Sequence, residues 1–300
     1  MSSESGQPAI GTVLVTGASR GIGLDFVRAW LERGVQVIAG CRNPTGASAL
    51  GTLMSEHGER LRVMQLDVTD ERSVETMAGA LGNLNIDLLI NNAGILQVES
   101  LENMDFASII EQFKVNALGA LQVTRALLSN LRDGAKIINI TSRMGSLDDN
   151  TSGGYYGYRM SKAALNMATR SLAVDLKGRG IIVIAMHPGM VQTDLTRGFG
   201  MLTPAESVAG MNQVIDKLTI EQSGLFLHYQ GTTLPWGACF EPCRVARSGL
   251  PGRSPCCCGQ PLRPLKATES LKPRVLRRLD GPKPNQPMEP NEPISCGCSN

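Results

Sequence analysis

Residues 12–23, T-V-L-V-T-G-A-S-R-G-I-G, place a short apolar, β-branched strand directly before three glycines. Helical periodicity follows at 24–33. Strand, glycine turn and helix form a phosphate-binding arrangement, because the free N–H groups and the dipole of the helix start face the anion. Gly17 permits the turn, Gly21 lets a pyrophosphate approach the backbone, and Gly23 lets the helix pack on the strand. The alternative is a loop whose glycines serve the turn alone.

Strand and helix signals alternate along the rest of the chain. We expect further strands at 35–41, 62–66, 86–90, 136–140, 181–186 and 225–228. Helices are expected at 71–81, 106–131, 163–176 and from 204 to about 218. This alternation predicts an α/β fold: a single Rossmann-type doubly wound parallel sheet of about seven strands with helices on both faces.

The end of the second strand carries a sign of cofactor preference. Where an acidic residue would accept the ribose 2′-hydroxyl of NAD, the chain has Cys41-Arg42-Asn43. Arg42, joined by Arg20 of the glycine loop, would pair with the 2′-phosphate of NADP. The alternative is that both arginines are solvated loop residues.

Tyr158 and Lys162 lie four positions apart at the start of a helical run. That spacing puts both on one helix face, so they could act on one bound molecule. A phenol has a reference pKa of about 10 and needs a nearby cation to ionise near neutral pH, and Lys162 could be that cation. Taken alone, the pair could equally be two surface residues.

Composition limits the classes of function. The 300 residues carry 29 basic and 27 acidic side chains, a net charge of +2, which gives no sign of a nucleic acid or membrane partner. The first ten residues lack a signal-peptide pattern, and no apolar run is long enough to span a bilayer. Cys41 is the single cysteine before Cys239. These features predict a reduced, cytoplasmic protein.

The chain divides into a flexible start at 1–11, a catalytic domain at 12–236 and a tail at 237–300. The tail holds eleven of the 16 prolines and seven of the eight cysteines, and we expect it to be disordered. The spacing of Cys256, Cys257 and Cys258 is poor for zinc, so no metal site is expected, although palmitoylation there is an alternative. The abrupt change in composition is typical of an alternative exon, a shifted reading frame or a gene-model error.

Seven motifs in sequence order carry a family resemblance. They are T-G-A-S-R-G-I-G, L-D-V-T, N-N-A-G, V-N-A-L-G, I-N-I-T-S, Y-R-M-S-K and H-P-G-M-V-Q-T. Over residues 12–236 the chain resembles the short-chain dehydrogenases/reductases, and within them it is similar to the C-factor/sniffer-type carbonyl reductases. The segment 147–154 departs from the family by lengthening the interval between Ser142 and Tyr158, which leaves the shape of the substrate open.

The resemblance implies roles for individual residues. Tyr158 would be the acid/base, Lys162 would lower its pKa and bind the nicotinamide ribose, Ser142 would hold the carbonyl oxygen, and Asn116 would hold a water in a proton relay. Asp67 would meet the adenine, Asn92 and Gly94 the adenosine ribose, and Thr193 the carboxamide. With Tyr158 and Lys162, the implied NADPH/NADP+ contacts are Gly17, Ser19, Arg20, Gly21, Ile22, Gly23, Arg42, Asp67, Val68, Asn92, Ala93, Gly94, Pro188, Gly189, Val191 and Thr193.

These residues predict NADPH-dependent reduction of a small aldehyde or ketone. The short segment 194–202, with Leu195, Phe199 and Met201, favours an apolar or aromatic carbonyl. Two alternatives remain: an NADP(H)-binding regulatory or signalling protein with little turnover, and a form inactivated by its tail. The family's habit of pairing subunits through two long helices makes a homodimer or homotetramer a further expectation.

Overall fold

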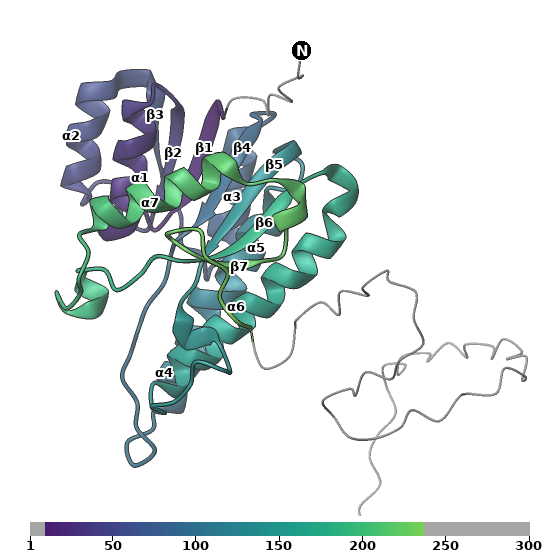
Figure 1. The fold of residues 1–300 in the computed structure, drawn as a ribbon. Coiled ribbons are helices and arrows are strands. Elements are labelled where there is room, and N and C mark those ends of the chain that lie inside the picture. Colours follow the sequence, from purple (N-terminus) through teal and green to yellow (C-terminus); the bar gives the residue numbers. More distant parts are fainter. Residues whose placement is uncertain (1–9, 237–300) are drawn as a thin grey trace, which may run out of the picture. The chain divides into compact units, whose positions relative to one another are not determined.

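Seven parallel strands form one sheet at the centre of the computed structural model, which describes residues 10–236 (Figure 1). The spatial order is β3-β2-β1-β4-β5-β6-β7. The strands are β1 (Thr12–Thr16), β2 (Gln36–Cys41), β3 (Leu61–Gln65), β4 (Ile86–Asn91), β5 (Leu131–Ile140), β6 (Ile182–His187) and β7 (Phe226–His228). The predicted doubly wound parallel sheet is therefore confirmed.

Helices cover both faces of this sheet. They are α1 (Gly21–Glu32), α2 (Ser48–His57), α3 (Glu71–Leu81), α4 (Phe106–Phe113), α5 (Gly119–Ala126), α6 (Tyr156–Asp175) and α7 (Pro204–Lys217). One core cluster joins the sheet to α1, α2 and α7 and includes the fully buried Phe26 and Trp30. The other joins it to α3, α5 and α6 around Met77 and Val123. Burying each large apolar side chain contributes about 1.5–3 kcal/mol, so the two clusters fix both layers on the sheet.

The strand order reverses between β1 and β4, which pair in parallel at the middle of the sheet. Chain connections leave these two strands in opposite directions, so their carboxyl ends open a crevice. Figure 1 shows α1 and α7 on the near side of the sheet, with α5 and α6 on the other side. The crevice is the place where a doubly wound fold binds its ligand.

Two elements differ from expectation. The helix expected over 106–131 is interrupted by a π-helical turn at Lys114–Leu118 and ends at Ala126, and β5 begins at Leu131. The helix α2 had no counterpart in the sequence prediction. Within residues 10–236, no helix is both long and apolar enough to cross a membrane. The expectations for 237–300 lie outside the described residues.

Candidate active site

The glycine turn between β1 and α1 leaves no room for side chains. A Cβ on Gly17, where φ is +65°, would lie 2.8 Å from the Cα of Ala93, and one on Gly23 would lie 2.3 Å from the carbonyl oxygen of Gly17. The start of α1 has neither a side-chain cap nor an acidic residue in its first turn. Its N–H groups are therefore available to an anion in the crevice.

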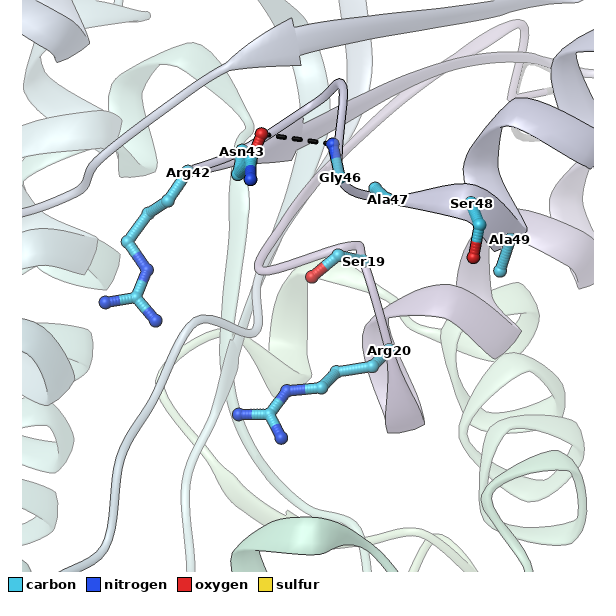
Figure 2. Close-up of a pocket in the computed structure, with 8 residues that line it drawn as sticks. All are labelled: Ser19, Arg20, Arg42, Asn43, Gly46, Ala47, Ser48 and Ala49. Atoms are coloured by element: carbon cyan, nitrogen blue, oxygen red, sulfur yellow. Dashed lines mark hydrogen bonds between the residues drawn. The ribbon is translucent and has the colours of Figure 1, made fainter.

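A cavity of about 310 Å³ opens beside this turn at the end of β2 (Figure 2). It is lined by Ser19, Arg20, Arg42, Asn43, Gly46, Ala47, Ser48 and Ala49. The carboxamide of Asn43 accepts from the Gly46 N–H at 3.1 Å and so shapes the loop that leads into α2. Three of these residues, Ser19, Arg20 and Arg42, were among the predicted cofactor contacts.

The two arginines of the cavity differ in their contacts. The guanidinium of Arg20 forms an ion pair with Asp194, and both side chains are largely exposed. Among the described residues Arg42 has no ion-pair partner. Arg42 is therefore the free cation of this cavity, whereas Arg20 links the glycine turn to the segment after β6.

The turns after β3 and β4 form the wall of the crevice next to the glycine turn. After β3, the carboxylate of Asp67 accepts from the N–H and hydroxyl of Thr69 at 2.9 and 2.7 Å, and Val68 is buried. After β4, the carboxamide of Asn92 donates to the carbonyl oxygens of Thr16 and Gly17 at 3.0 and 3.2 Å. The Asn92 bonds fix the turn after β4 to the glycine turn, and the Asp67 bonds fix the shape of the turn after β3.

Ser142, Tyr158 and Lys162 lie close together where the carboxyl end of β5 meets the start of α6. Ser142 lies near enough to the Tyr158 hydroxyl to lower the pKa of the phenol, and its own hydroxyl oxygen accepts from the Met144 N–H at 3.2 Å. The Lys162 Nζ lies 5.7 Å from the centre of the Tyr158 ring and donates to the carbonyl oxygen of Ile140 at 2.9 Å. A Cβ on Gly94 would lie 3.6 Å from the same Nζ, so the lysine borders the crevice wall after β4. The structure thus brings together three of the four residues for which a catalytic role was predicted.

Burial is the main cause of the pKa shifts of Tyr158 and Lys162. It raises the pKa of the Tyr158 phenol to about 12, opposed by the hydrogen bond with Ser142, and it lowers the pKa of Lys162 to about 8. The direction for Tyr158 differs from the lowered pKa expected from the sequence, because a buried phenolate loses its hydration. Near neutral pH the phenol therefore carries its proton, and most of the amine is ammonium.

Asn116, the fourth predicted catalytic residue, sits in the π-helical turn beside Lys162. Its carboxamide donates to the Ile95 carbonyl oxygen and to the Ser161 hydroxyl, both at 2.9 Å, and accepts from the Ile95 N–H at 2.8 Å. Its oxygen would lie 3.2 Å from a Cβ on Gly94. Both N–H groups of the Asn116 carboxamide therefore donate to protein atoms. The water expected in the proton relay would need other hydrogen-bond partners in this turn.

The segment after β6 closes the crevice from the other side. The carbonyl oxygen of Pro188 accepts from the Ser207 hydroxyl at 2.6 Å, and Gly189 has a φ of +85°. Val191 forms a bridge with Leu202. A Cβ on Gly21 would lie 3.5 Å from the Thr193 methyl group, so Thr193 faces the glycine turn. Of the predicted contacts in this segment, Thr193 therefore lies opposite the glycine turn.

Sequence reasoning missed Asn43 and the start of α2, which line the cavity. Their signal is weak, because α2 buries only Leu50 and Leu53 and the loop before it has no periodicity. Among residues 10–236 no cluster of three or more His, Cys, Asp or Glu could hold a metal ion.

Comparison with known sequences identifies relatives over most of the chain. The short chain dehydrogenase family model matches residues 11–200. A 1-hydroxy-2-glutathionyl-2-methyl-3-butene dehydrogenase of Rhodococcus sp. (strain AD45) is 40% identical over 231 residues, 75% of this chain and 99% of the relative. The C-signal protein of Myxococcus xanthus is 51% identical over 154 residues, 50% of this chain and 93% of the relative.

Solved structures resemble the fold as a whole. An NADPH-bound carbonyl reductase from chicken fatty liver aligns with a TM-score of 0.72 at 37% identity and covers 76% of this chain and 100% of its own. The carbonyl reductase Sniffer of D. melanogaster aligns with a TM-score of 0.73 at 31% identity and the same coverage.

Proposed function

Because the chain belongs to the short-chain dehydrogenase family, a family of oxidoreductases, we propose that it reduces a small aldehyde or ketone to the alcohol with NADPH. The resemblance to an NADPH-bound carbonyl reductase supports both the cofactor and the direction of the reaction. The observation that carries the proposal is the meeting of Ser142, Tyr158 and Lys162 beside Gly94, at the mouth of the crevice.

The crevice has the features that NADPH requires. Gly17 and Gly23 leave a backbone cradle that any Cβ would fill, and the uncapped start of α1 offers N–H groups to a pyrophosphate. Arg42 is free to pair with a 2′-phosphate in the cavity at the end of β2. The bound dinucleotide would supply the hydride, and the contacts predicted from the sequence would hold it.

The protein residues would supply the proton and stabilise charge. As hydride reaches the carbonyl carbon, negative charge develops on the oxygen, and the hydroxyls of Ser142 and Tyr158 would donate to it. Tyr158 would then transfer its proton, leaving a phenolate. The ammonium of Lys162 would stabilise that phenolate, and its desolvated position strengthens the attraction.

Replacing Tyr158 with phenylalanine tests the proposal. Tyr158→Phe keeps the ring and removes only the proton donor, so we expect NADPH binding to persist and turnover to fall by about 10²–10⁴-fold. The measurement is NADPH oxidation against a panel of aldehydes and ketones, with cofactor binding followed by fluorescence. Near-normal turnover in the variant would refute the role of Tyr158.

The resemblance to C-signal favours a second candidate, a signalling protein that binds NADP(H) with little turnover. A pure binder has no chemical use for a buried phenol beside a buried amine, so the first proposal is preferred. If the wild-type protein binds NADPH but oxidises it with no carbonyl of the panel, the second candidate stands instead.

A further inference from the structure

Glu99 is the only acidic residue among positions 10–236 whose side chain is buried. It lies in the loop between β4 and α4 and is 3% exposed. Burying a carboxylate is costly unless hydrogen-bond donors surround it, and this one has donors on both of its oxygens. The sequence gives no reason to expect a buried charge in this loop.

One side of Glu99 holds the start of α6. Its carbonyl oxygen accepts from the Tyr155 N–H at 2.9 Å, and its Oε2 accepts from the Gly157 N–H at 3.3 Å. The helix has no cap of its own, because Tyr155 provides no side-chain bond and the first turn contains no acidic residue. Glu99 therefore caps the helix from another part of the chain and places negative charge at its positive end.

The other side of Glu99 holds α4. Its Oε1 accepts from the Gln112 carboxamide and from the Ser108 hydroxyl, the latter at 3.3 Å. Gln112 is fully buried and accepts in turn from the Gln97 N–H at 3.0 Å. One carboxylate thus joins the loop, α4 and α6.

Gly157 shows how tightly these parts meet. A Cβ on this residue would lie 2.5 Å from the Gln112 Nε2 and 2.9 Å from the Glu99 Oε1. The next residue along α6 is Tyr158. The backbone that carries the phenol is therefore held directly against the carboxylate.

We propose that Glu99 is a positioning residue for reduction: its carboxylate fixes the first turn of α6 and thereby the Tyr158 hydroxyl. The proposal rests on the proposed function, since Tyr158 is the group it positions. A displacement of about 1 Å in a reacting group can cost on the order of 10² in rate. Loss of the cap should therefore lower kcat while the glycine turn and the NADPH cavity stay intact.

Glu99→Gln is the most informative single change. An amide replaces one acceptor oxygen with a donor, so it cannot accept from both Gly157 and Gln112. We expect kcat to fall by about 10- to 100-fold, the Kd for NADPH to stay unchanged, and amide hydrogen exchange at residues 155–158 to become faster. The exchange measurement needs no enzymatic turnover.

A double variant tests the geometry of the network. In Glu99→Gln with Gln112→Glu, the new carboxylate at 112 can accept from the new carboxamide at 99, whose oxygen can still accept from Gly157. Recovery of kcat in this pair is expected. Asp105→Ala is the matched control, because Asp105 caps α4 by accepting from the Ala107 and Ser108 N–H groups at 2.9 and 3.2 Å and forms no hydrogen bond to α6.

The outcomes separate the two proposals. Loss of kcat and of exchange protection in Glu99→Gln, with recovery in the double variant and little loss in Asp105→Ala, would support the positioning role. Unchanged kcat and exchange in Glu99→Gln would overturn it. Losses of kcat and exchange protection in Asp105→Ala that equal those in Glu99→Gln would overturn it as well. If the wild-type protein reduces no carbonyl, the proposed function and the expected effect on kcat fail together. The exchange data then test only whether Glu99 caps α6.

Discussion

At the level of single residues, Arg42 and Arg20 line the same cavity but differ in their ion-pair partners. Asp194 engages Arg20, and no described acidic residue engages Arg42. A guanidinium bound to a phosphate is worth about 1.5–3 kcal/mol for each charged hydrogen bond. We therefore expect Arg42→Asp to weaken NADPH binding by at least this amount and NADH binding far less.

The measurement for Arg42 is the Kd of each cofactor, compared with Arg20→Ala as the control. The control should cost less, because Arg20 must first leave Asp194 to reach a phosphate. Equal losses for NADPH and NADH in Arg42→Asp would contradict the assignment of the 2′-phosphate to this cavity.

The lowered pKa of Lys162 predicts how reduction depends on pH. Burial brings this pKa to about 8, so the ammonium is present below pH 8 and is lost as pH rises through that value. Tyr158, with a pKa of about 12, keeps its proton over the same range. We expect kcat/KM for reduction to be constant below about pH 8 and to decline above it.

Lys136 provides the control for that profile. It is also buried with a lowered pKa, but its Nζ donates to the Ile215 carbonyl oxygen at the end of α7. Lys136→Met should leave the shape of the profile unchanged. A flat profile between pH 7 and 9, or an alkaline limb that disappears in Lys136→Met, would count against Lys162 as the titrating group.

At the level of elements, local chemistry made several predictions reliable. The helix expected at 71–81 is α3, and Asp70 caps it by accepting from the Arg72 N–H at 3.0 Å. The helix expected from residue 204 is α7, which starts with a capping box between Thr203 and Glu206 and has a proline in its first turn. A capping residue and the backbone group that it binds are only a few positions apart, so both can be recognised in the sequence.

Elements fixed by distant contacts were harder to predict. The apolar period of 106–131 continues through the π-helical turn, but Asn116 is held there by Ile95 and Ser161. The sequence at Leu131 is equally compatible with a helix, yet in the structure Leu131 pairs with Ile86 at the start of β5. The burial of Glu99 depends in the same way on partners that only the folded chain brings together.

At the level of the whole molecule, the site is assembled from the carboxyl ends of six strands, β1 to β6. The glycine turn, Arg42, Asn92, Ser142 and Thr193 come from five different loops. A parallel sheet places these ends along one edge, so a sequence that predicts the strands also predicts the neighbourhood of the site. It does not predict which groups pair, as the contacts of Arg20 and Asn116 illustrate.

The Rhodococcus dehydrogenase and the chicken carbonyl reductase align over nearly their whole length with about three quarters of this chain. We expect residues 1–236 to be sufficient for the proposed reduction. Trp236 completes the described fold: its ring lies 5.1 Å from that of Phe226, and its carbonyl oxygen accepts from the Leu147 N–H at 3.2 Å. Pro235 similarly accepts from the Ser146 hydroxyl at 2.7 Å. These contacts hold the loop that follows Ser142.

We therefore expect a chain ending at residue 236 to oxidise NADPH with the same kcat/KM as the full chain. A chain ending at residue 233 should lose activity, because the loop after Ser142 then has neither the Pro235 nor the Trp236 carbonyl oxygen to bind. Both truncations and the full chain would be assayed against the same carbonyl panel. Lower activity at 1–236 would show that 237–300 contributes to the reaction, whereas higher activity would show that this segment obstructs it.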